Sequence, residues 1–311
     1  MIANFFNNAK PINSVFLLAA LILFYFLAHF NIDFIPFSID FWSIKIGGLL
    51  LLIGLFFIYN FIISKNNLTL SNSYSLLFIS LSIGLFYPVL SQFKILLSLV
   101  IIGFSFRRIY SFRTNQNVKE KIFDSALWIA LASMVYFENL YFLLLIYIGL
   151  MVFQRNYWNY FFIPIVGFLV PYFLIYVYAL TFNDFTFFNT LVSNRFTFNT
   201  GIFNHTHLLF YISIITLVGV AAFIINTIKT SEFSIEFRAL WSLVLAHFIL
   251  AIFYLFTGET FNISKTVFLI FPFGIIMANY MQTVSKKWIK EIVVYLFIGL
   301  VISRFIYNFV P

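Results

Sequence analysis

Two kinds of residue are scarce in this sequence. It has no cysteine, and only 9% of its 311 residues are charged, whereas 63% are hydrophobic. The lack of cysteine excludes disulfides, thiolate metal sites and a cysteine nucleophile. Soluble globular domains carry roughly 25% charged residues, and a single soluble core cannot bury this much apolar surface. We therefore predict that much of the chain lies in lipid.

Short motifs of several enzyme classes are also missing. There is no nucleotide-binding glycine loop, no His-Glu-x-x-His zinc motif and no serine-centred elbow. Gly47, Gly48 and Gly54 are instead placed where small residues allow close helix packing. Because no polar linker or soluble block interrupts the chain, we predict that residues 1–311 form a single transmembrane domain.

Apolar runs long enough to cross a bilayer recur along the whole sequence. A hydrocarbon core about 30 Å thick needs roughly 20 helical residues at a rise of about 1.5 Å each. We predict about eleven helices, at residues 13–30, 43–64, 73–90, 93–107, 121–137, 139–154, 160–180, 208–228, 238–256, 265–283 and 290–308. Two adjacent pairs are separated by tight turns, because Pro88 lacks a backbone donor and Asn139 favours turns. The predicted fold class is an all-α, polytopic transmembrane helical bundle.

Lysine and arginine are distributed unevenly between the two sides of this predicted bundle. With the N-terminus in the cytoplasm, 13 of the 18 basic residues fall on the cytoplasmic side and five fall outside. The outer five are Lys45, Lys94, Arg195, Lys265 and Arg304. This bias follows the positive-inside rule and places the C-terminus in the periplasm. The net charge of +8 is therefore a topological signal, and we predict no nucleic-acid partner.

Acidic residues on the predicted cytoplasmic side lie among the basic ones. We expect them to pair with lysine and arginine at helix ends; they are Glu120, Asp124, Glu232, Glu236 and Glu291. His247 lies within the ninth predicted helix, where an ionisable group is costly and usually faces the protein interior. We expect a neutral imidazole that is bonded to a neighbouring helix.

Acids and histidines also gather on the predicted outer side. They are His29, Asp33, Asp40, Glu138, Asp184, His205, His207 and Glu259. Carboxylates and imidazoles are the usual general acids, bases and metal ligands, so this grouping indicates a site that opens outward. If the chain is an enzyme, Asp33 and Asp40 in the first outer loop are the leading candidates for a catalytic base or a ligand of a divalent metal. The alternative is that these residues are polar because loops face water.

The longest outer loop spans residues 181–207. Arg195, outside against the charge bias, suits a phosphate or diphosphate headgroup, although a salt bridge at the rim is the alternative. Alternate spacing predicts that His205 and His207 lie on the same side of an extended segment, which suits a metal, but no third ligand is evident. The predicted substrate-binding residues are Glu138, Asp184, Arg195, His205 and His207.

A resemblance to a known family supports the membrane assignment. MIANFFNNAKPIN at residues 1–13, and NVKEKIFD at residues 117–124 followed by an apolar hairpin, resemble an uncharacterised family of polytopic proteins from Bacteroidota. The likeness covers the whole chain. It implies a protein of the inner membrane of a Gram-negative cell envelope, with no established activity.

A looser resemblance covers residues 123–176. This stretch resembles the middle of multi-spanning (GT-C-like) glycosyltransferases, which take sugars from polyprenyl-phosphate carriers. The likeness rests on the hairpin around Glu138, the basic exit at Arg155 and the helix interrupted by Pro164, Gly167 and Pro171. It implies a catalytic acid in the first outer loop, at Asp33 or Asp40. That loop is shorter than in those enzymes and lacks their adjacent Asp-Asp or Asp-Glu pair.

Two functions are consistent with these patterns. The first is an envelope enzyme that acts on a lipid-linked sugar or another envelope lipid at the periplasmic face, for which the outer acids should converge on one cavity. The second is a non-catalytic subunit or scaffold of an envelope membrane complex, for which an apolar or aromatic belt should bind partner helices. A transporter ranks third, because the sequence lacks paired ionisable residues within its spans.

Overall fold

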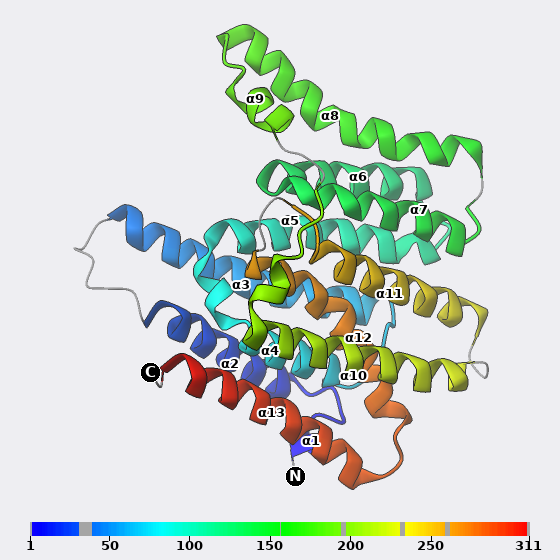
Figure 1. The fold of residues 1–311 in the computed structure, drawn as a ribbon. Helices are drawn as coiled ribbons and strands as arrows, with labels where there is room; N and C mark the ends of the chain where they lie inside the picture. The colour runs from blue at the N-terminus through cyan, green and yellow to red at the C-terminus, as the bar shows by residue number, and fades with distance from the viewer. Residues whose placement is uncertain are drawn as a thin grey trace. The chain divides into compact units, whose positions relative to one another are not determined.

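The computed structural model describes residues 2–30, 39–155, 157–193, 197–230, 234–258 and 262–309. In these ranges the elements are helices, and one isolated bridge joins Phe198 to Thr257 (Figure 1). Contacts divide the chain into two compact units. Unit 1 consists of Met1–Leu96, His205–Ser234 and Ile263–Pro311; unit 2 consists of Leu97–Asn204 and Ile235–Asn262. Helix α5, Phe93–Tyr110, begins in unit 1 and continues into unit 2.

Unit 1 is built around an almost completely buried helix. Its elements are α1 (Ile2–Phe5), α2 (Pro11–Phe30), α3 (Ile39–Lys65), α4 (Tyr74–Leu85), η1 (Tyr87–Ser91), α10 (Thr206–Thr230), η5 (Ile263–Thr266), α12 (Val267–Thr283) and α13 (Lys287–Phe309). In the most apolar stretch of residues 263–283, which contains α12, 89% of the residues are buried, and α12 packs chiefly against α4 and α10. Close approach to α4 depends on Gly274, because a Cβ there would lie 2.5 Å from Ile79.

The glycines of α3 only partly match their predicted packing role. A Cβ at Gly48 would lie 2.6 Å from the hydroxyl of Tyr25, which donates a hydrogen bond of 2.6 Å to the Lys45 carbonyl, and one at Gly47 would lie 3.1 Å from Phe93. Those two positions confirm close packing. The prediction is wrong for Gly54, where a Cβ would meet no atom of the described residues within 4 Å.

Unit 2 contains the hairpin and the proline-containing helix that the sequence analysis singled out. Its elements are η2 (Ser111–Arg113), α6 (Val118–Val135), η3 (Phe137–Phe142), α7 (Leu143–Val152), α8 (Trp158–Phe182), α9 (Thr186–Ser193), η4 (Gly201–Asn204) and α11 (Ile235–Tyr254). Helix α8 continues through Pro164 and Pro171, and both prolines are buried. It ends at Phe182 and is followed by Asn183, whose φ of 52° is left-handed, a conformation that asparagine tolerates well.

Helices α6 and α8 make the most extensive contact in unit 2 and lie side by side (Figure 1). Gly167 allows this approach, because a Cβ there would lie 2.6 Å from the Phe123 carbonyl oxygen. A hydrogen bond of 2.9 Å between the hydroxyls of Ser133 and Tyr172 joins the two helices further along. The opposite face of α8 is exposed, and only 17% of the residues in the most apolar stretch of this helix are buried.

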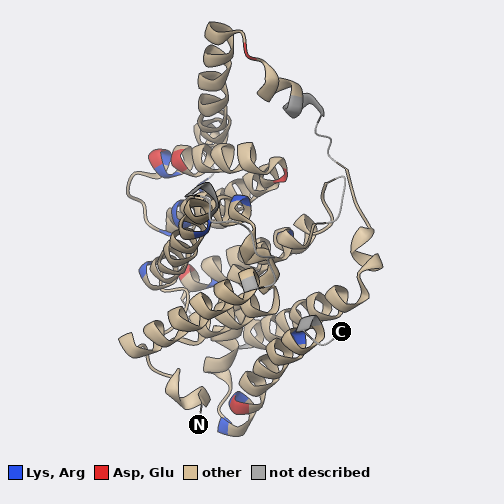
Figure 2. Cartoon of the chain, turned by 90° about the vertical axis from the view of Figure 1, so that its left-hand side faces the viewer, with Lys and Arg blue, Asp and Glu red and all other residues tan. Residues whose placement is uncertain are grey.

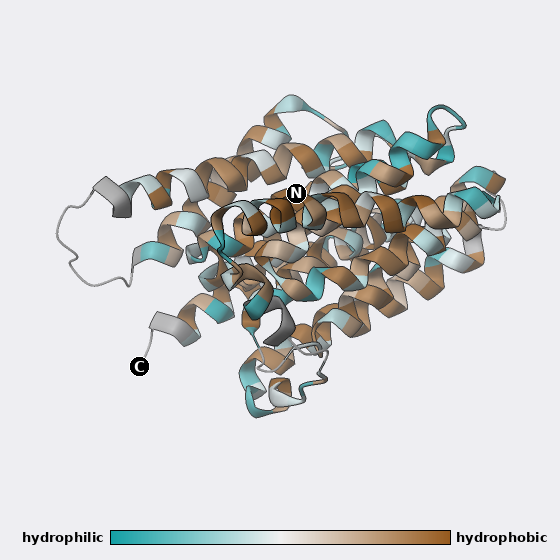
Figure 3. Cartoon of the chain, turned by 90° about the horizontal axis from the view of Figure 1, so that it is seen from above, coloured by the Kyte–Doolittle hydropathy of each residue, from teal (hydrophilic) through white to brown (hydrophobic). Residues whose placement is uncertain are grey.

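All eleven apolar segments that we predicted are helical, and the two predicted breaks occur as the short helices η1 and η3. Among the described residues, seven helices are long and apolar enough to cross a membrane: residues 11–29, 42–65, 93–113, 158–182, 206–228, 235–254 and 263–283. Hydrophobic residues run along the helices and hydrophilic ones gather toward helix ends and connections (Figure 3). Length and composition therefore indicate a multi-pass membrane protein.

Candidate functional site

A buried polar cluster lies where η3 meets α5 and the end of α11. The Asn139 amide donates to the Ser98 hydroxyl at 2.8 Å and to the Ala132 carbonyl at 2.9 Å, and it accepts a hydrogen bond of 3.1 Å from the Tyr254 hydroxyl. Asn139, Ser98 and Tyr254 are at most 1% exposed. Buried polar groups are costly unless they are hydrogen-bonded, so this cluster holds η3 firmly in place.

Glu138 precedes Asn139 in η3 and is only partly exposed. Its carboxylate acts electrostatically on Tyr136, Tyr141 and Tyr254. The site therefore holds one carboxylate that interacts electrostatically with three tyrosines, on a short helix that buried hydrogen bonds fix. We call this part of unit 2, from Tyr136 to Phe142 with the end of α11, the Glu138 end.

The long loop of unit 2 is anchored at the Glu138 end by backbone pairing. The Asn199 amide donates to the Phe256 carbonyl at 2.8 Å, and the Gly258 amide donates to the Thr197 carbonyl at 2.9 Å. The Phe198 ring lies 5.2 Å from Phe253, which lies 5.4 Å from Tyr141. This pairing attaches the segment that directly follows residues 194–196 to the same end as Glu138.

Three of the predicted site residues fall wholly or partly outside the described residues. Asp33 and Arg195 lie in undescribed segments, and for Asp40 only the backbone, in the first turn of α3, is described. Asp184 is described and fully exposed. Its Oδ1 accepts hydrogen bonds from the Thr186 hydroxyl at 2.6 Å and the Thr186 amide at 3.1 Å, and these bonds lower the pKa of the carboxyl. Asp184 therefore forms an Asx turn directly before α9.

The predicted arrangement of the two loop histidines is wrong. Helix α10 begins at Thr206, so His207 lies in its first turn and the segment is not extended there. Residues two apart on a helix point in directions about 200° apart, so the spacing does not bring His205 and His207 together. The His207 ring packs on Tyr307 with centroids 4.2 Å apart. Within the described ranges, no three His, Asp or Glu side chains come together as metal ligands.

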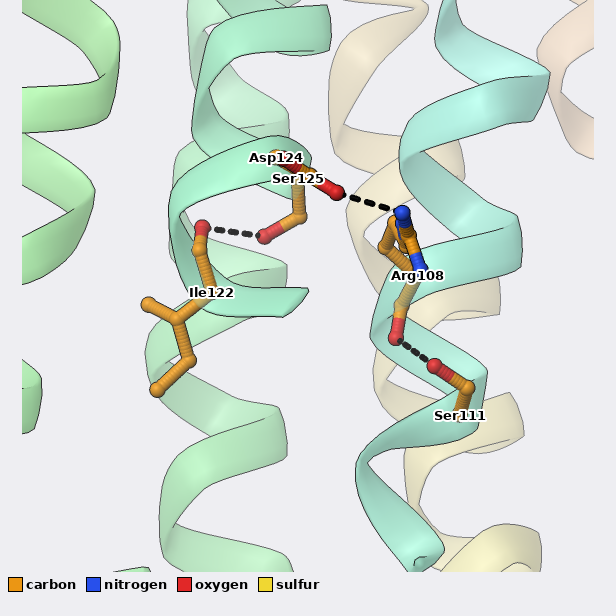
Figure 4. A network of polar contacts seen from close by, with 5 residues as sticks. All are labelled: Arg108, Ser111, Ile122, Asp124 and Ser125. Atoms are coloured by element: carbon orange, nitrogen blue, oxygen red, sulfur yellow. Dashed lines mark hydrogen bonds and ion pairs between the residues drawn. The ribbon is translucent and has the colours of Figure 1, made fainter. Parts of the chain in front are cut away.

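The opposite end of unit 2 carries a concentration of positive charge, which we call the basic end. Arg108 on α5 forms an ion pair of 2.6 Å with Asp124 on α6 (Figure 4), and Arg113 forms one of 2.7 Å with Glu236 on α11. The prediction that these acids pair with basic residues is confirmed for Asp124 and Glu236. Glu291, in unit 1, accepts a hydrogen bond of 3.2 Å from the Ala3 backbone amide.

Lys121 at the basic end is only 8% exposed, which the sequence did not indicate. Its ammonium donates to the carbonyls of Ser111 at 2.9 Å and Thr114 at 3.2 Å, and to the Thr114 hydroxyl at 2.5 Å. Arg155 donates to the Phe112 carbonyl at 3.3 Å in the same turn. The polar residues from Arg113 to Asn117 were the sequence signal that could have predicted this burial. They indicate a tight turn, and a tight turn exposes the carbonyls that a buried ammonium needs.

Charge is strongly segregated along unit 2. All seven of its described basic residues lie at the basic end: Arg107, Arg108, Arg113, Lys119, Lys121, Arg155 and Arg238. Three acids accompany them, whereas the opposite end holds Glu138 and Asp184 and no described lysine or arginine. Basic residues accordingly form a few compact groups, some of them with acidic residues, on a chain that is mostly uncharged (Figure 2).

Comparison with known proteins identifies the family of the chain. A family of unknown function, DUF6427, matches residues 1–310. The chain belongs to this family. No curated protein and no solved structure matches the chain. The expectation of an uncharacterised family that covers the whole chain is thus confirmed.

Proposed function

We propose that this DUF6427 protein is an enzyme of the inner membrane of a Bacteroidota envelope, and that it acts on a lipid-linked sugar or another envelope lipid from the periplasmic side. The observation that carries the proposal is Glu138, a half-buried carboxylate on a hairpin that buried hydrogen bonds hold in place, which interacts electrostatically with three tyrosines. A half-buried carboxylate of this kind suits general acid or base catalysis.

The proposed orientation follows from the charge segregation of unit 2. Basic residues favour the cytoplasmic side of a membrane, so the basic end faces the cytoplasm and the Glu138 end faces the periplasm. With eleven crossings, the N-terminus is cytoplasmic and the C-terminus periplasmic. This arrangement also suits a GT-C-like architecture, in which the lipid carrier presents its sugar at the outer face.

The remaining candidates keep secondary roles in this proposal. Asp33 and Asp40 are the further candidates for the catalytic base or for holding a divalent metal, and Arg195 is the candidate phosphate contact. The loop that carries Arg195 supports this role, because the segment from Thr197 to Asn199 is anchored at the Glu138 end. His205 and His207 are proposed as substrate contacts without a metal role, and Asp184 serves mainly to form the turn that precedes α9.

Replacement of Glu138 tests this proposal. In a strain that lacks the gene, we expect wild-type protein to restore the normal profile of lipid-linked envelope intermediates, measured by mass spectrometry, whereas Glu138→Gln should fail despite normal membrane abundance. Glu120→Gln is the matched control, since Glu120 is an exposed acid at the basic end of the same unit. Full restoration by Glu138→Gln contradicts the proposed catalytic role.

The exposed face of α8 favours a second function, a non-catalytic subunit of an envelope complex. Only one stripe of this helix, with Pro164, Gly167 and Pro171, is buried, while large side chains such as Phe162 and Phe173 are exposed. A partner transmembrane helix is one surface that such rings fit. Purification in mild detergent separates the two functions, because a chain that runs alone and monodisperse contradicts the subunit hypothesis.

A further inference from the structure

Arg304 is a buried cation near the end of an apolar helix of unit 1. It lies five residues before the end of α13, about 8 Å from it at the helical rise. The residue is 8% exposed, and its neighbours along the helix include Ile302, Phe305 and Ile306. Guanidinium groups do not lose their proton in proteins, so this position is charged.

The described surroundings offer the guanidinium little compensation. Its carbon lies 5.6 Å from the centre of the Tyr211 ring on α10, and its Nε is enclosed without a hydrogen-bond partner among the described residues. The Tyr211 hydroxyl is 3.2 Å from the Ser303 hydroxyl, which itself donates to the Leu300 carbonyl at 2.8 Å. Because the one hydroxyl proton of Ser303 is used in this bond, the Tyr211 hydroxyl donates to Ser303. The proton of Tyr211 is therefore not available to another acceptor.

No described carboxylate of unit 1 can neutralise Arg304. Glu291 is the one acid of this unit whose side chain is described, and it lies 13 residues earlier on the same helix, about 20 Å away. It accepts a hydrogen bond from the Ala3 amide instead. An unpaired buried charge is strongly destabilising, and ionisable groups in membrane helices usually mark a ligand or an ion path.

Two side-chain contacts join α10 and α13 on either side of Arg304, and we call them the inner and the outer rung. The inner rung joins Tyr211 to Ser303, and the outer rung stacks His207 on Tyr307 at 4.2 Å. His207 precedes Tyr211 by one turn, and Tyr307 follows Arg304 by three residues, so the outer rung lies beyond Arg304 toward the helix ends. His207, Ser303 and Tyr307 are exposed, which leaves this side of the helix pair open to a ligand.

We propose that Arg304 is the anion-binding residue of a phosphate site between α10 and α13, with His207 and Tyr307 at its mouth. The planar guanidinium donates two parallel hydrogen bonds to phosphate oxygens and is fixed here on an aromatic ring. The phosphate belongs either to a lipid headgroup or to free inorganic phosphate. This proposal is independent of the enzymatic function assigned to the Glu138 end.

Binding of phosphate compounds to the purified full-length chain in neutral detergent tests the site. The probes are a short-chain phosphatidic acid and inorganic phosphate, and affinity is measured by titration calorimetry. We expect wild-type protein to bind a probe, and Arg304→Gln to bind it about ten- to a hundred-fold more weakly, as expected for charged hydrogen bonds. Lys287→Gln, which removes an exposed charge at the other end of the same helix, should bind as the wild type does.

The two probes distinguish the source of the phosphate. Binding of phosphatidic acid alone assigns a lipid headgroup, and equal binding of inorganic phosphate assigns a free anion. Arg304→Lys keeps the charge but loses the planar fork, so it should bind more weakly even if Arg304→Gln does not fold.

Three results overturn the proposal. The first is that neither probe binds the wild type, the second is that the probe binds equally to wild type and Arg304→Gln, and the third is that Arg304→Lys binds as tightly as wild type. If Arg304 instead forms an ion pair with an acid of the first outer loop, neither probe should bind the wild type. Arg304→Gln would then show a non-additive loss of stability with Asp33→Asn or Asp40→Asn in a double-mutant cycle.

Discussion

Individual residues show how differently two buried cations are accommodated. Lys121 and Arg304 are each 8% exposed. The Lys121 ammonium donates to three oxygens of Ser111 and Thr114, whereas Arg304 lies over an aromatic ring and its Nε has no hydrogen-bond partner among the described residues. Since burial of a charge is tolerated when its hydrogen bonds are satisfied, Lys121 serves the fold, and a ligand is what we propose for Arg304.

Lys121→Met tests the structural role of the first cation. Methionine has a similar length but cannot donate to the Thr114 oxygens, so we expect the free energy of unfolding to fall by about 1–3 kcal/mol. Thermal unfolding in detergent measures the change as a lower Tm. Lys119→Met, two residues away and exposed, is the control and should leave Tm unchanged. An equal Tm for both variants would contradict the role assigned to Lys121.

Residue-level predictions from sequence succeeded where the local structure was assigned correctly. His247 was expected to bond to a neighbouring helix, and its Nδ1 lies 3.1 Å from the Tyr110 hydroxyl on α5. The expectation for His205 and His207 failed because α10 starts at Thr206, earlier than predicted. For Lys121 and Arg304 the sequence predicted only the side of the membrane on which each lies. It did not predict their burial, because burial depends on neighbours that are distant in sequence.

At the level of elements, apolar length and turn residues were sufficient to locate the long apolar helices. Pro88 and Asn139 mark breaks that occur as η1 and η3, and each predicted apolar segment is helical. Helix α9 was not predicted, because its eight residues lie in a polar loop and carry no long apolar run. Among the described residues, helices α6 and α13 are not among the seven candidate spans, and Tyr74–Leu85 and Phe137–Val152 are apolar but shorter.

Gly167→Val tests the packing of α6 against α8. The new Cβ would lie 2.6 Å from the Phe123 carbonyl oxygen, a backbone atom that cannot turn aside. We expect a loss of about 1–3 kcal/mol, the usual cost of overpacking, and a lower Tm. Gly299→Val on α13 is the control, because a Cβ there would lie more than 4 Å from the atoms of every other described part of the chain. Wild-type stability of Gly167→Val would show that the two helices pack less closely than described.

The whole molecule has a division that no sequence pattern marks. The boundary between the units lies inside α5, between Leu96 and Leu97, and later segments return to each unit. A search for polar linkers cannot find such a boundary, because the helix continues across it. Since α5 is unbroken there, we propose that residues 1–311 fold as one membrane domain.

The central claim is that unit 2 spans the membrane with its basic end in the cytoplasm and Glu138 on the outer side. Because the chain has no cysteine, single cysteines can be labelled without background. Gln116→Cys lies in the turn before α6 at the basic end, and Thr200→Cys follows the segment that is anchored at the Glu138 end; both positions are exposed.

A membrane-impermeant maleimide applied to intact spheroplasts tests that claim directly. We predict that Thr200→Cys is labelled at once and that Gln116→Cys is labelled only after the membrane is permeabilised. Labelling of Gln116→Cys in intact spheroplasts, with Thr200→Cys protected, would reverse the orientation and remove Glu138 from the periplasmic face.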